Sequence, residues 1–234
     1  KTSDLSFSIA PKINAAGRLD DIAIGIKCLI SSNENEAEGY AKQLIAFNEQ
    51  RKYVEKKMKD TALSSLSECI VKDNFTITMF DVNWHQGVIG ILAARLKEKY
   101  YRPTIIFAKD DNNLLKGSGR SISSFHLKDA LDSVSKKNPD LILTFGGHAM
   151  AAGLTIKEDN FKIFCSEFEF VARKLLSKDD LNLTIEFDKS LPLEYLNHKS
   201  IKDINSQIWG QGFPAPVFFG IFDVVKQEII ANNH

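Results

Sequence analysis

A histidine stands between two glycines and a run of small side chains in segment 146–153, Gly-Gly-His-Ala-Met-Ala-Ala-Gly. The apolar run 141–145 before it is typical of a buried strand. The glycines are therefore expected at the carboxyl end of that strand, where open α/β sheets bind ligands. Glycine leaves backbone amides uncovered, which suits an anion such as phosphate. Gly146, Gly147 and His148 are candidate phosphate contacts, although a Gly-Gly pair often forms only a tight turn and a lone histidine is often structural.

A second segment, Trp-His-Gln-Gly-Val-Ile-Gly-Ile-Leu-Ala-Ala-Arg at 84–95, joins an expected strand to an expected helix. The first turn of that helix presents unpaired amides and the positive end of the helix dipole. His85 and Gln86 lie where they could hydrogen-bond an anion bound there. In the alternative interpretation, Trp84 packs in the core, Gln86 only caps the helix, and the glycines allow close packing.

A third segment, Lys-Gly-Ser-Gly-Arg-Ser at 116–121, places a guanidinium between two hydroxyls. Arg120 can hold a phosphate through two parallel hydrogen bonds, and Ser118 and Ser121 can supply further donors. A glycine-rich hairpin that merely carries an arginine is the alternative. All three segments are expected at one edge of a single sheet, so a shared phosphodiester-binding cleft explains them together.

The elements that position these segments alternate between strands and helices. The chain is expected to be loop-like up to about Asp21 and then to form a long amphipathic helix over 35–67, with one break allowed. Strands are expected at 75–82, 103–108, 114–121 and 141–145, and helices at 86–100, 127–135 and 158–176. This alternation predicts an α/β layer structure. Beyond it we expect a short strand at 184–187, a polar helical segment at 193–208, irregular structure at 209–216 and a strand pattern at 217–230.

Charge is balanced along the whole chain but not locally. The 234 residues, enough for one large domain or two smaller ones, carry thirty basic and thirty acidic side chains. Segment 95–137 holds ten basic and five acidic side chains, whereas segment 158–194 holds nine acids and five bases. This asymmetry permits a basic groove, although scattered solvated side chains would produce the same count.

The remaining composition bounds the class of protein. The three cysteines, which lack metal-site spacing and fit a reducing cytoplasm as small buried hydrophobes, are Cys28, Cys69 and Cys165. No signal-like segment and no run long enough to cross a membrane is found. The chain starts without a methionine, so we expect it to be part of a longer protein.

Five motifs, in order, resemble those of the RecJ single-stranded-DNA exonucleases of the DHH phosphoesterase superfamily. They are Pro-Lys-Ile-Asn-Ala-Ala-Gly-Arg-Leu-Asp-Asp at 11–21, the segments 84–95, 117–121 and 146–148, and Trp-Gly-Gln-Gly-Phe-Pro-Ala-Pro-Val-Phe at 209–218. The last motif resembles the start of the oligonucleotide-binding domain of those proteins. The resemblance implies a mixed-sheet, DHH-associated α/β domain, preceded by a long connecting helix and followed by the start of an oligonucleotide-binding β-barrel.

The same resemblance implies a domain organisation. Residues 1–30 would be the tail of a DHH phosphoesterase domain, 31–70 the connecting helix, 71–178 the DHH-associated domain, and 179–234 the beginning of an incomplete oligonucleotide-binding domain. In the family, a preceding DHH domain binds Mn²⁺ or Mg²⁺ and hydrolyses the phosphodiester. No Asp-His-His tripeptide or comparable cluster occurs in this chain, so we assign it no metal ligand and no cofactor.

Roles for single residues follow from the resemblance as well. The residues that match positions facing the cleft, where they would contact DNA phosphates or the scissile end, are Arg18, Gln86, Arg120 and His148. Those expected to assist through hydroxyls and backbone amides are Ser118, Ser121, Gly146 and Gly147. His148 has a supporting catalytic role as well, because it can stabilise the phosphoryl transition state beside metals held by the DHH domain.

The resemblance therefore implies the substrate-binding half of a metal-dependent 5′-3′ exonuclease acting on single-stranded DNA in recombination and repair. The chain alone is expected to be inactive. Its expected partners are single-stranded DNA and DNA-repair proteins such as a helicase or a single-strand-binding protein. We expect it in the cytoplasm, with no association with a membrane. Two alternatives stay open. A phosphoesterase for short oligonucleotides or cyclic dinucleotides would lack the motif at 209–218, and a non-catalytic nucleic-acid-binding or protein-interaction module is disfavoured by the motif at 13–18.

Overall fold

The computed structural model describes residues 4–66, 73–110, 112–210 and 212–228. Contacts between residues divide the chain into two compact units, Lys1–Asn182 and Leu183–His234. The described part of the chain contains no helix long and apolar enough to cross a membrane. Cys69 lies outside the described residues, as do the last residues of the segments expected to be regular at 35–67 and 217–230.

The first unit begins with helices where the sequence predicted a loop. A short π-helical turn, η1 (Leu5–Ile9), leads into α2 (Ala10–Leu19), and α3 (Ala23–Ile30) follows. The prediction of a loop up to about Asp21 is wrong because Pro11 falls in the first turn of α2, where its missing N–H costs no hydrogen bond. The small side chains of this segment, Ala15 and Ala16, are fully buried and therefore pack a helix.

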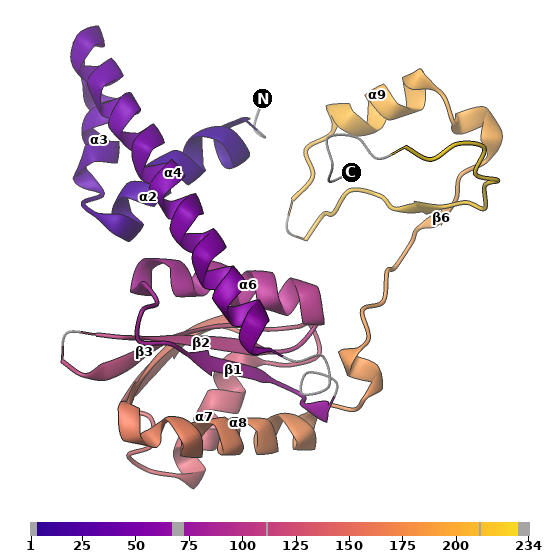
Figure 1. Ribbon diagram of the computed structural model, residues 1–234. Helices are drawn as coiled ribbons and strands as arrows, with labels where there is room; N and C mark the ends of the chain where they lie inside the picture. The colour runs from indigo at the N-terminus through magenta and orange to yellow at the C-terminus, as the bar shows by residue number, and fades with distance from the viewer. Residues whose placement is uncertain (1–3, 67–72, 111, 211, 229–234) are drawn as a thin grey trace. The chain divides into compact units, whose positions relative to one another are not determined.

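The predicted long helix is confirmed and is unbroken. Helix α4 spans Glu34–Ser65, which is 32 residues or about 48 Å. Asn33 caps its N-terminus by accepting hydrogen bonds from the amides of Asn35 and Glu36. The helix contacts α2, α3 and α6, and Figure 1 shows it running from α3 to the sheet. It therefore connects the N-terminal helices to the α/β layer.

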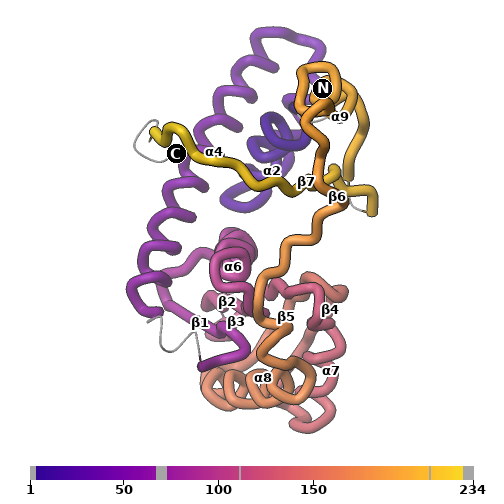
Figure 2. Tube along the Cα trace, turned by 90° about the vertical axis from the view of Figure 1, so that its right-hand side faces the viewer, coloured from indigo at the N-terminus to yellow at the C-terminus, as the bar shows by residue number. Residues whose placement is uncertain are grey.

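Five strands form one mixed sheet in the order β1-β2-β3-β5-β4. Their bounds are β1 Ile77–Phe80, β2 Thr104–Lys109, β3 Leu114–Arg120, β4 Thr144–Gly147 and β5 Ala151–Lys157. Within this sheet β1 and β2 are parallel, whereas β3 is antiparallel to both β2 and β5, and β4 is antiparallel to β5. The expected mixed-sheet α/β architecture is confirmed, with β4 at the edge beside β5 (Figure 2).

Helices cover the two faces of the sheet unequally. Helix α6 (Gln86–Tyr100) lies on one face, and α7 (Leu127–Lys137) and α8 (Phe161–Leu175) lie on the other (Figure 1). The predicted helices at 86–100 and 127–135 are confirmed, and the one at 158–176 begins with a 3₁₀ turn, η2 (Glu158–Asn160). The core below α7 and α8 contains the stacked and edge-on phenylalanines Phe107, Phe125, Phe164 and Phe168. A separate, smaller core joins α4, α6, β1 and β2.

The hairpin of the Gly-Gly-His segment differs from the prediction. The strand expected at 141–145 begins only at Thr144 and contains the two glycines, so the turn follows them instead of starting with them. Pairing with β5, from Thr144 opposite Thr155 to Gly147 opposite Ala152, sets these bounds. Strand β5 was not predicted, because its first three residues are small and give no alternation of polar and apolar side chains.

The second unit is described from Leu183 onward. It contains β6 (Lys189–Ser190), η4 (Leu193–Tyr195), α9 (His198–Ser206) and β7 (Phe218–Phe219), and β6 pairs in parallel with β7. The polar helical segment expected at 193–208 is confirmed. The strand expected at 184–187 is wrong, since pairing with β7 occurs at 189–190 instead. The start of an oligonucleotide-binding barrel in this unit stays a prediction.

Candidate phosphate-binding surface

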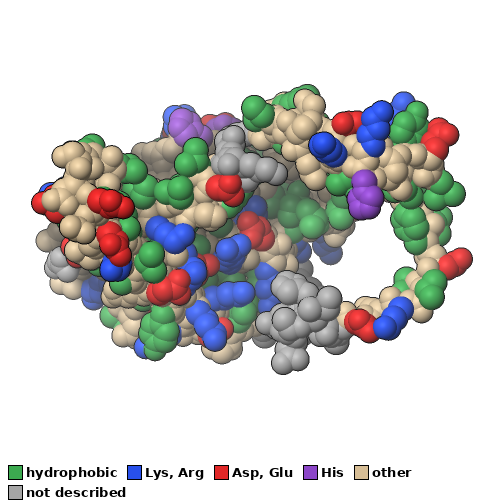
Figure 3. Space-filling model, turned by 90° about the horizontal axis from the view of Figure 1, so that it is seen from above, with side chains coloured by type: hydrophobic (Ala, Val, Ile, Leu, Met, Phe, Trp, Pro, Cys, Tyr) green, Lys and Arg blue, Asp and Glu red, His purple; other side chains and the backbone are tan. Residues whose placement is uncertain are grey.

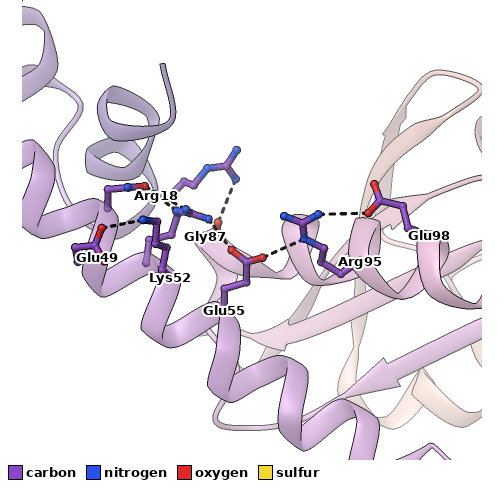
Figure 4. A network of polar contacts seen from close by, with 9 residues as sticks. Arg18, Glu49, Lys52, Glu55, Gly87, Arg95 and Glu98 are labelled. Atoms are coloured by element: carbon purple, nitrogen blue, oxygen red, sulfur yellow. Dashed lines mark hydrogen bonds and ion pairs between the residues drawn. The ribbon is translucent and has the colours of Figure 1, made fainter. Parts of the chain in front are cut away.

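The end of α2 lies against the start of α6. Arg18 Nη1 donates a hydrogen bond of 3.3 Å to the carbonyl oxygen of Gly87, a residue 69 positions later in the chain (Figure 4). A β-carbon at Gly87 would stand 2.0 Å from the carbonyl oxygen of Arg18, so only glycine permits this approach. The Arg18 guanidinium therefore lies at the first turn of α6.

Strand β3 approaches the same helix one turn further along. A β-carbon at Gly90 would lie 2.9 Å from Ser118 Oγ and 3.1 Å from Arg120 Nη2. Arg120 Nη1 donates to Ser118 Oγ over 3.3 Å and to the carbonyl oxygen of Gly119 over 2.7 Å. Because side chains alternate along a strand, Ser118 and Arg120 face α6, while Gly119 faces Leu127 of α7. The glycines of α6 thus bring Arg18, Ser118 and Arg120 together.

The two arginines form a positive site without a counter-charge. Burial lowers the pKa of Arg120 below the ordinary guanidinium value, and the neighbouring charge of Arg18 lowers this pKa further. No carboxylate among the described residues forms an ion pair with either guanidinium. An anion bound between them would relieve the repulsion. Phosphate suits this place because arginine can bind it through two hydrogen bonds.

A network of ion pairs holds α4 against α6 beside this site (Figure 4). Glu55 of α4 accepts hydrogen bonds from Arg51 Nη1 over 2.6 Å and from Arg95 Nε over 3.3 Å. Arg95 Nη1 also lies 3.4 Å from Glu98 Oε2, and the hydrogen bond with Glu55 raises the pKa of Arg95. These guanidinium groups have carboxylate partners and therefore serve the packing of two helices, in contrast to Arg18 and Arg120.

The Gly-Gly-His hairpin places His148 level with Arg120 on the sheet. Arg120 pairs with Ala151 of β5, and the amide of His148 donates to the carbonyl oxygen of Ala151 over 2.8 Å. Because adjacent strands lie about 4.8 Å apart, the Cα atoms of His148 and Arg120 are roughly 10 Å apart. The His148 side chain is exposed. Gly147 has a φ of 144°, and a β-carbon there would meet the Ala151 carbonyl oxygen at 2.4 Å, so this turn requires glycine.

Three residues of the expected set, Gln86, Ser121 and His85, have polar side-chain atoms that bond to other parts of the chain. The Gln86 side chain donates to the carbonyl oxygen of Lys109, the last residue of β2, whereas Arg120 pairs with Thr104, the first residue of β2. These two ends of β2 are about 17 Å apart, so the backbone of Arg120 and the side-chain amide of Gln86 lie at opposite ends of β2. The expectation that all three segments share one edge is wrong, because β3 and β4 run opposite to β1.

Ser121 and His85 have structural partners. Ser121 is 1% exposed and its hydroxyl donates to the carbonyl oxygen of Phe125 over 2.6 Å, so the structure does not bring this hydroxyl to the surface that carries Arg120. His85 caps α6, because its Nδ1 accepts the amide hydrogen of Gly87 over 3.1 Å. That amide is therefore not free for an anion. The ring of His85 remains exposed beside Arg18's partner Gly87.

Sequence reasoning underrated the two glycines of α6. The alternative interpretation, in which they permit close packing and Trp84 lies in the core, is correct: Trp84 is 6% exposed. That packing is nevertheless what assembles the site. Gly87 and Gly90 are three residues apart and thus share one helix face, which was the available signal. Gly90 was absent from the expected set, and so was Lys116, which lies on the same face of β3 as Ser118 and Arg120.

The side chains of this surface suit an anion and not a metal ion. In the described parts of the chain, no group of three or more His, Cys, Asp or Glu side chains could hold a metal. Arginine, serine and glycine dominate the surface, whereas Mg²⁺ and Mn²⁺ prefer carboxylate and other oxygen ligands. Figure 3 shows one face of the molecule, on which Lys and Arg side chains lie among Asp and Glu side chains.

Comparisons with known proteins agree with the motifs and the fold. Residues 72–174 match the DHHA1 domain family. The single-stranded-DNA-specific exonuclease RecJ of Haemophilus influenzae is 40% identical over 236 residues, which cover 99% of this chain and 41% of that protein. RecJ of Escherichia coli is 40% identical over 237 residues, again with 99% and 41% coverage. The chain spans about two fifths of the length of these relatives.

Solved structures agree as well. The crystal structure of RecJ from Thermus thermophilus in complex with Mg²⁺ matches with a TM-score of 0.80 and 29% sequence identity, covering 93% of this chain and 33% of that one. The Mn²⁺ complex of the same protein matches with a TM-score of 0.81. A DHHA1 domain, sequence identity along nearly the whole chain and a shared three-dimensional structure lead to one conclusion: this chain belongs to the RecJ family.

Proposed function

We propose that this chain is the substrate-binding half of a single-stranded-DNA-specific 5′-3′ exonuclease that acts in DNA recombination and repair. The observation that carries the proposal is the pair formed by Arg18 and Arg120. Segments about a hundred residues apart bring two guanidinium groups together with no carboxylate partner among the described residues, and one of the two is half-buried. A phosphate of a DNA strand is the anion that would fit there.

The chain would hold the strand through its backbone. Arg18 and Arg120 bind a phosphate, Ser118 adds a hydroxyl, and the bare amides near Gly146 let the strand approach the sheet. Such contacts carry no sequence information, so binding should tolerate any sequence and weaken as salt is added. His148, at the same level of the sheet as Arg120, would contact a neighbouring phosphoryl oxygen in a supporting role.

Hydrolysis would take place at a metal centre outside this chain's residues. We infer that Mg²⁺ or Mn²⁺, as in the complexes of the Thermus protein, supplies an activated water and neutralises charge on the phosphoryl group. The residues of this chain would do the positioning: the arginines orient the strand, and the packing of α2 on α6 fixes their separation. The chain by itself would then bind DNA without cleaving it.

The proposal includes the proteins that would act together with the exonuclease and the place where they would meet. An exonuclease for single-stranded DNA needs a source of single strands, so a helicase or a single-strand-binding protein would be its partner in the cytoplasm. A phosphoesterase for short oligonucleotides or cyclic dinucleotides is the competing function. It would be more active on dinucleotides than on long strands, whereas an exonuclease gains affinity with strand length.

The test uses the full-length protein with Arg120→Ala and, separately, His148→Ala. Fluorescence anisotropy with a labelled single strand should show at least about a tenfold loss of affinity for Arg120→Ala, because a charged hydrogen-bonded contact is lost. The cleavage rate should fall for both variants. Lys162→Ala on α8, an exposed lysine on the opposite side of the sheet, is the control. Unchanged binding and cleavage in Arg120→Ala would refute the role of the arginine pair.

A further inference from the structure

A groove of about 460 Å³ lies on the face of the sheet toward which Ser118 and Arg120 point, the α6 side. Helix α6 packs against β2 and β3, and the groove lies beyond it, over β3, β5 and β4. The lining residues that face this side are Lys116, Thr144, Gly146, Gly153 and Thr155. The volume falls in the range of pockets that hold small ligands, so the groove has room for more than a phosphate group.

The floor of the groove is bare backbone. A β-carbon at Gly146 would meet no atom within 4 Å, and one at Gly153 would meet only the carbonyl oxygen of Gly117, at 3.8 Å. These two glycines are paired across β4 and β5, and Ser118 of β3 pairs with Gly153. The absence of side chains on two adjacent strands leaves a flat surface that a sugar or a base could approach closely.

Lys116 supplies the positive charge of the groove. Its Nζ donates to Thr155 Oγ1 over 3.2 Å and lies 3.8 Å from a carboxylate oxygen of Asp110. The ion pair is long and the Lys116 side chain is 44% exposed, so the ammonium can turn toward a ligand at little cost. Thr155 is 6% exposed and its hydroxyl oxygen accepts the hydrogen bond from Lys116, so Lys116 is the group at this end of the groove that can reach a ligand.

The groove extends along β3 from Ser118 and Arg120 toward Lys116. Lys116, Ser118 and Arg120 occupy alternate positions of β3 and share a face, with steps of about 6.8 Å between them. A strand of DNA held by a phosphate at Arg120 and Ser118 could thus place its next nucleotide over Gly153 and Gly146. Its following phosphate would then reach Lys116.

We propose that this groove is a second nucleotide subsite for the bound single strand, with Lys116 as the contact to its phosphate. The proposal rests on the proposed function in one respect, the phosphate at Arg120. It adds a direction to the bound strand, along β3 from Arg120 toward Lys116, and it explains why the half of the sheet not covered by α6 carries bare glycines.

The first test compares Lys116→Ala with Lys162→Ala in the full-length protein, using a dinucleotide and a longer oligothymidylate. For the longer strand, Lys116→Ala should lower the affinity about tenfold, and the slope of log K against log salt should become shallower by about 0.7, the value for one phosphate contact in a single strand. For the dinucleotide the loss should be small. Equal behaviour of Lys116→Ala and Lys162→Ala on the longer strand would overturn the subsite.

The second test fills the groove without changing charge. Gly153→Val adds a side chain in open space on a strand, so the melting temperature should stay within a few degrees while affinity for the longer strand falls. Gly39→Ala, which also meets no atom within 4 Å but lies on α4, is the matched control. Should Gly153→Val bind the longer strand as the unchanged protein does, no nucleotide lies over β5 and the subsite is refuted.

The outcomes separate the subsite from the proposed function. Loss of binding at all lengths in Arg120→Ala, with no effect of Lys116→Ala, would support the proposed function and overturn the subsite. An effect of Lys116→Ala together with an unaffected Arg120→Ala would refute the arginine pair and leave the groove as the place where the strand binds. A lower melting temperature of Lys116→Ala with unchanged affinity would show that Lys116 only supports the fold, which also overturns the subsite.

Discussion

The two faces of the sheet use the same residue type for opposite purposes. On the face covered by α7 and α8, Gly117 and Gly119 leave room for neighbouring side chains: added β-carbons would stand 2.6 Å from Leu154 and 2.7 Å from Leu127. On the α6 side, Gly146 and Gly153 leave open space. A glycine thus serves close packing where the face is covered and ligand approach where it is not, and its role follows only from what lies above it.

The largest effect is expected at Gly147, in the turn between β4 and β5. Gly147→Ala should destabilise the protein by roughly 4 kcal/mol, because it combines an unfavourable positive φ with a β-carbon 2.4 Å from a backbone oxygen. Urea unfolding followed by circular dichroism measures this loss. Stability unchanged within error would mean that the hairpin has another conformation, and the placement of His148 would then have to be abandoned.

A smaller effect separates the two faces directly. Gly117→Ala should cost about 2 kcal/mol by overpacking against Leu154 and Phe107, whereas Gly153→Ala, on the adjacent strand and the opposite face, should cost less than about 0.5 kcal/mol. Parallel urea titrations of both variants make the comparison. Equal losses in the two would contradict the distinction between a packed and an open face.

The smallest effect concerns a thiol on α8. Burial raises the pKa of Cys165 from 9.0 to about 11, so the folded protein keeps the thiol protonated where the unfolded chain ionises it. The stability that this group contributes is complete below pH 9 and is lost as the pH rises from about 9 to 11. Cys165→Ala should show a flatter dependence of unfolding free energy on pH in that window. An identical slope in both proteins would show that the thiol is solvated.

Local patterns were sufficient for the elements with strong periodicity. Helix α6 was predicted with its observed bounds, and the long helix α4 within two residues, because their apolar spacing is regular and no proline interrupts it. Elements built from small residues were missed. Strand β5 starts Ala-Ala-Gly, and α2 starts Ala-Pro, so neither shows the alternation or the uninterrupted period on which such predictions depend.

The candidate site was predictable in composition but not in arrangement. The sequence singled out Ser118, Arg120 and His148 from their residue types and glycine neighbours, and Arg18 through the resemblance to the family. It did not reveal that Ser121 turns inward to Phe125, or that Gln86 reaches the far end of β2. Both depend on hydrogen bonds to backbone atoms brought close by the fold.

The sequence by itself therefore determined which functional groups are present: guanidinium groups, bare amides and an imidazole in three glycine-bearing segments. It also determined the family to which the chain belongs. What only the tertiary structure decided is which of these groups meet. The direction of each strand depends on pairing between distant residues. Strands β3 and β4 both run opposite to β2 and β5, so their last residues bring Arg120 and His148 to the same end of the sheet. Packing likewise decides whether the space above a glycine is occupied by neighbouring side chains or left open, since no local pattern encodes the element that lies above it.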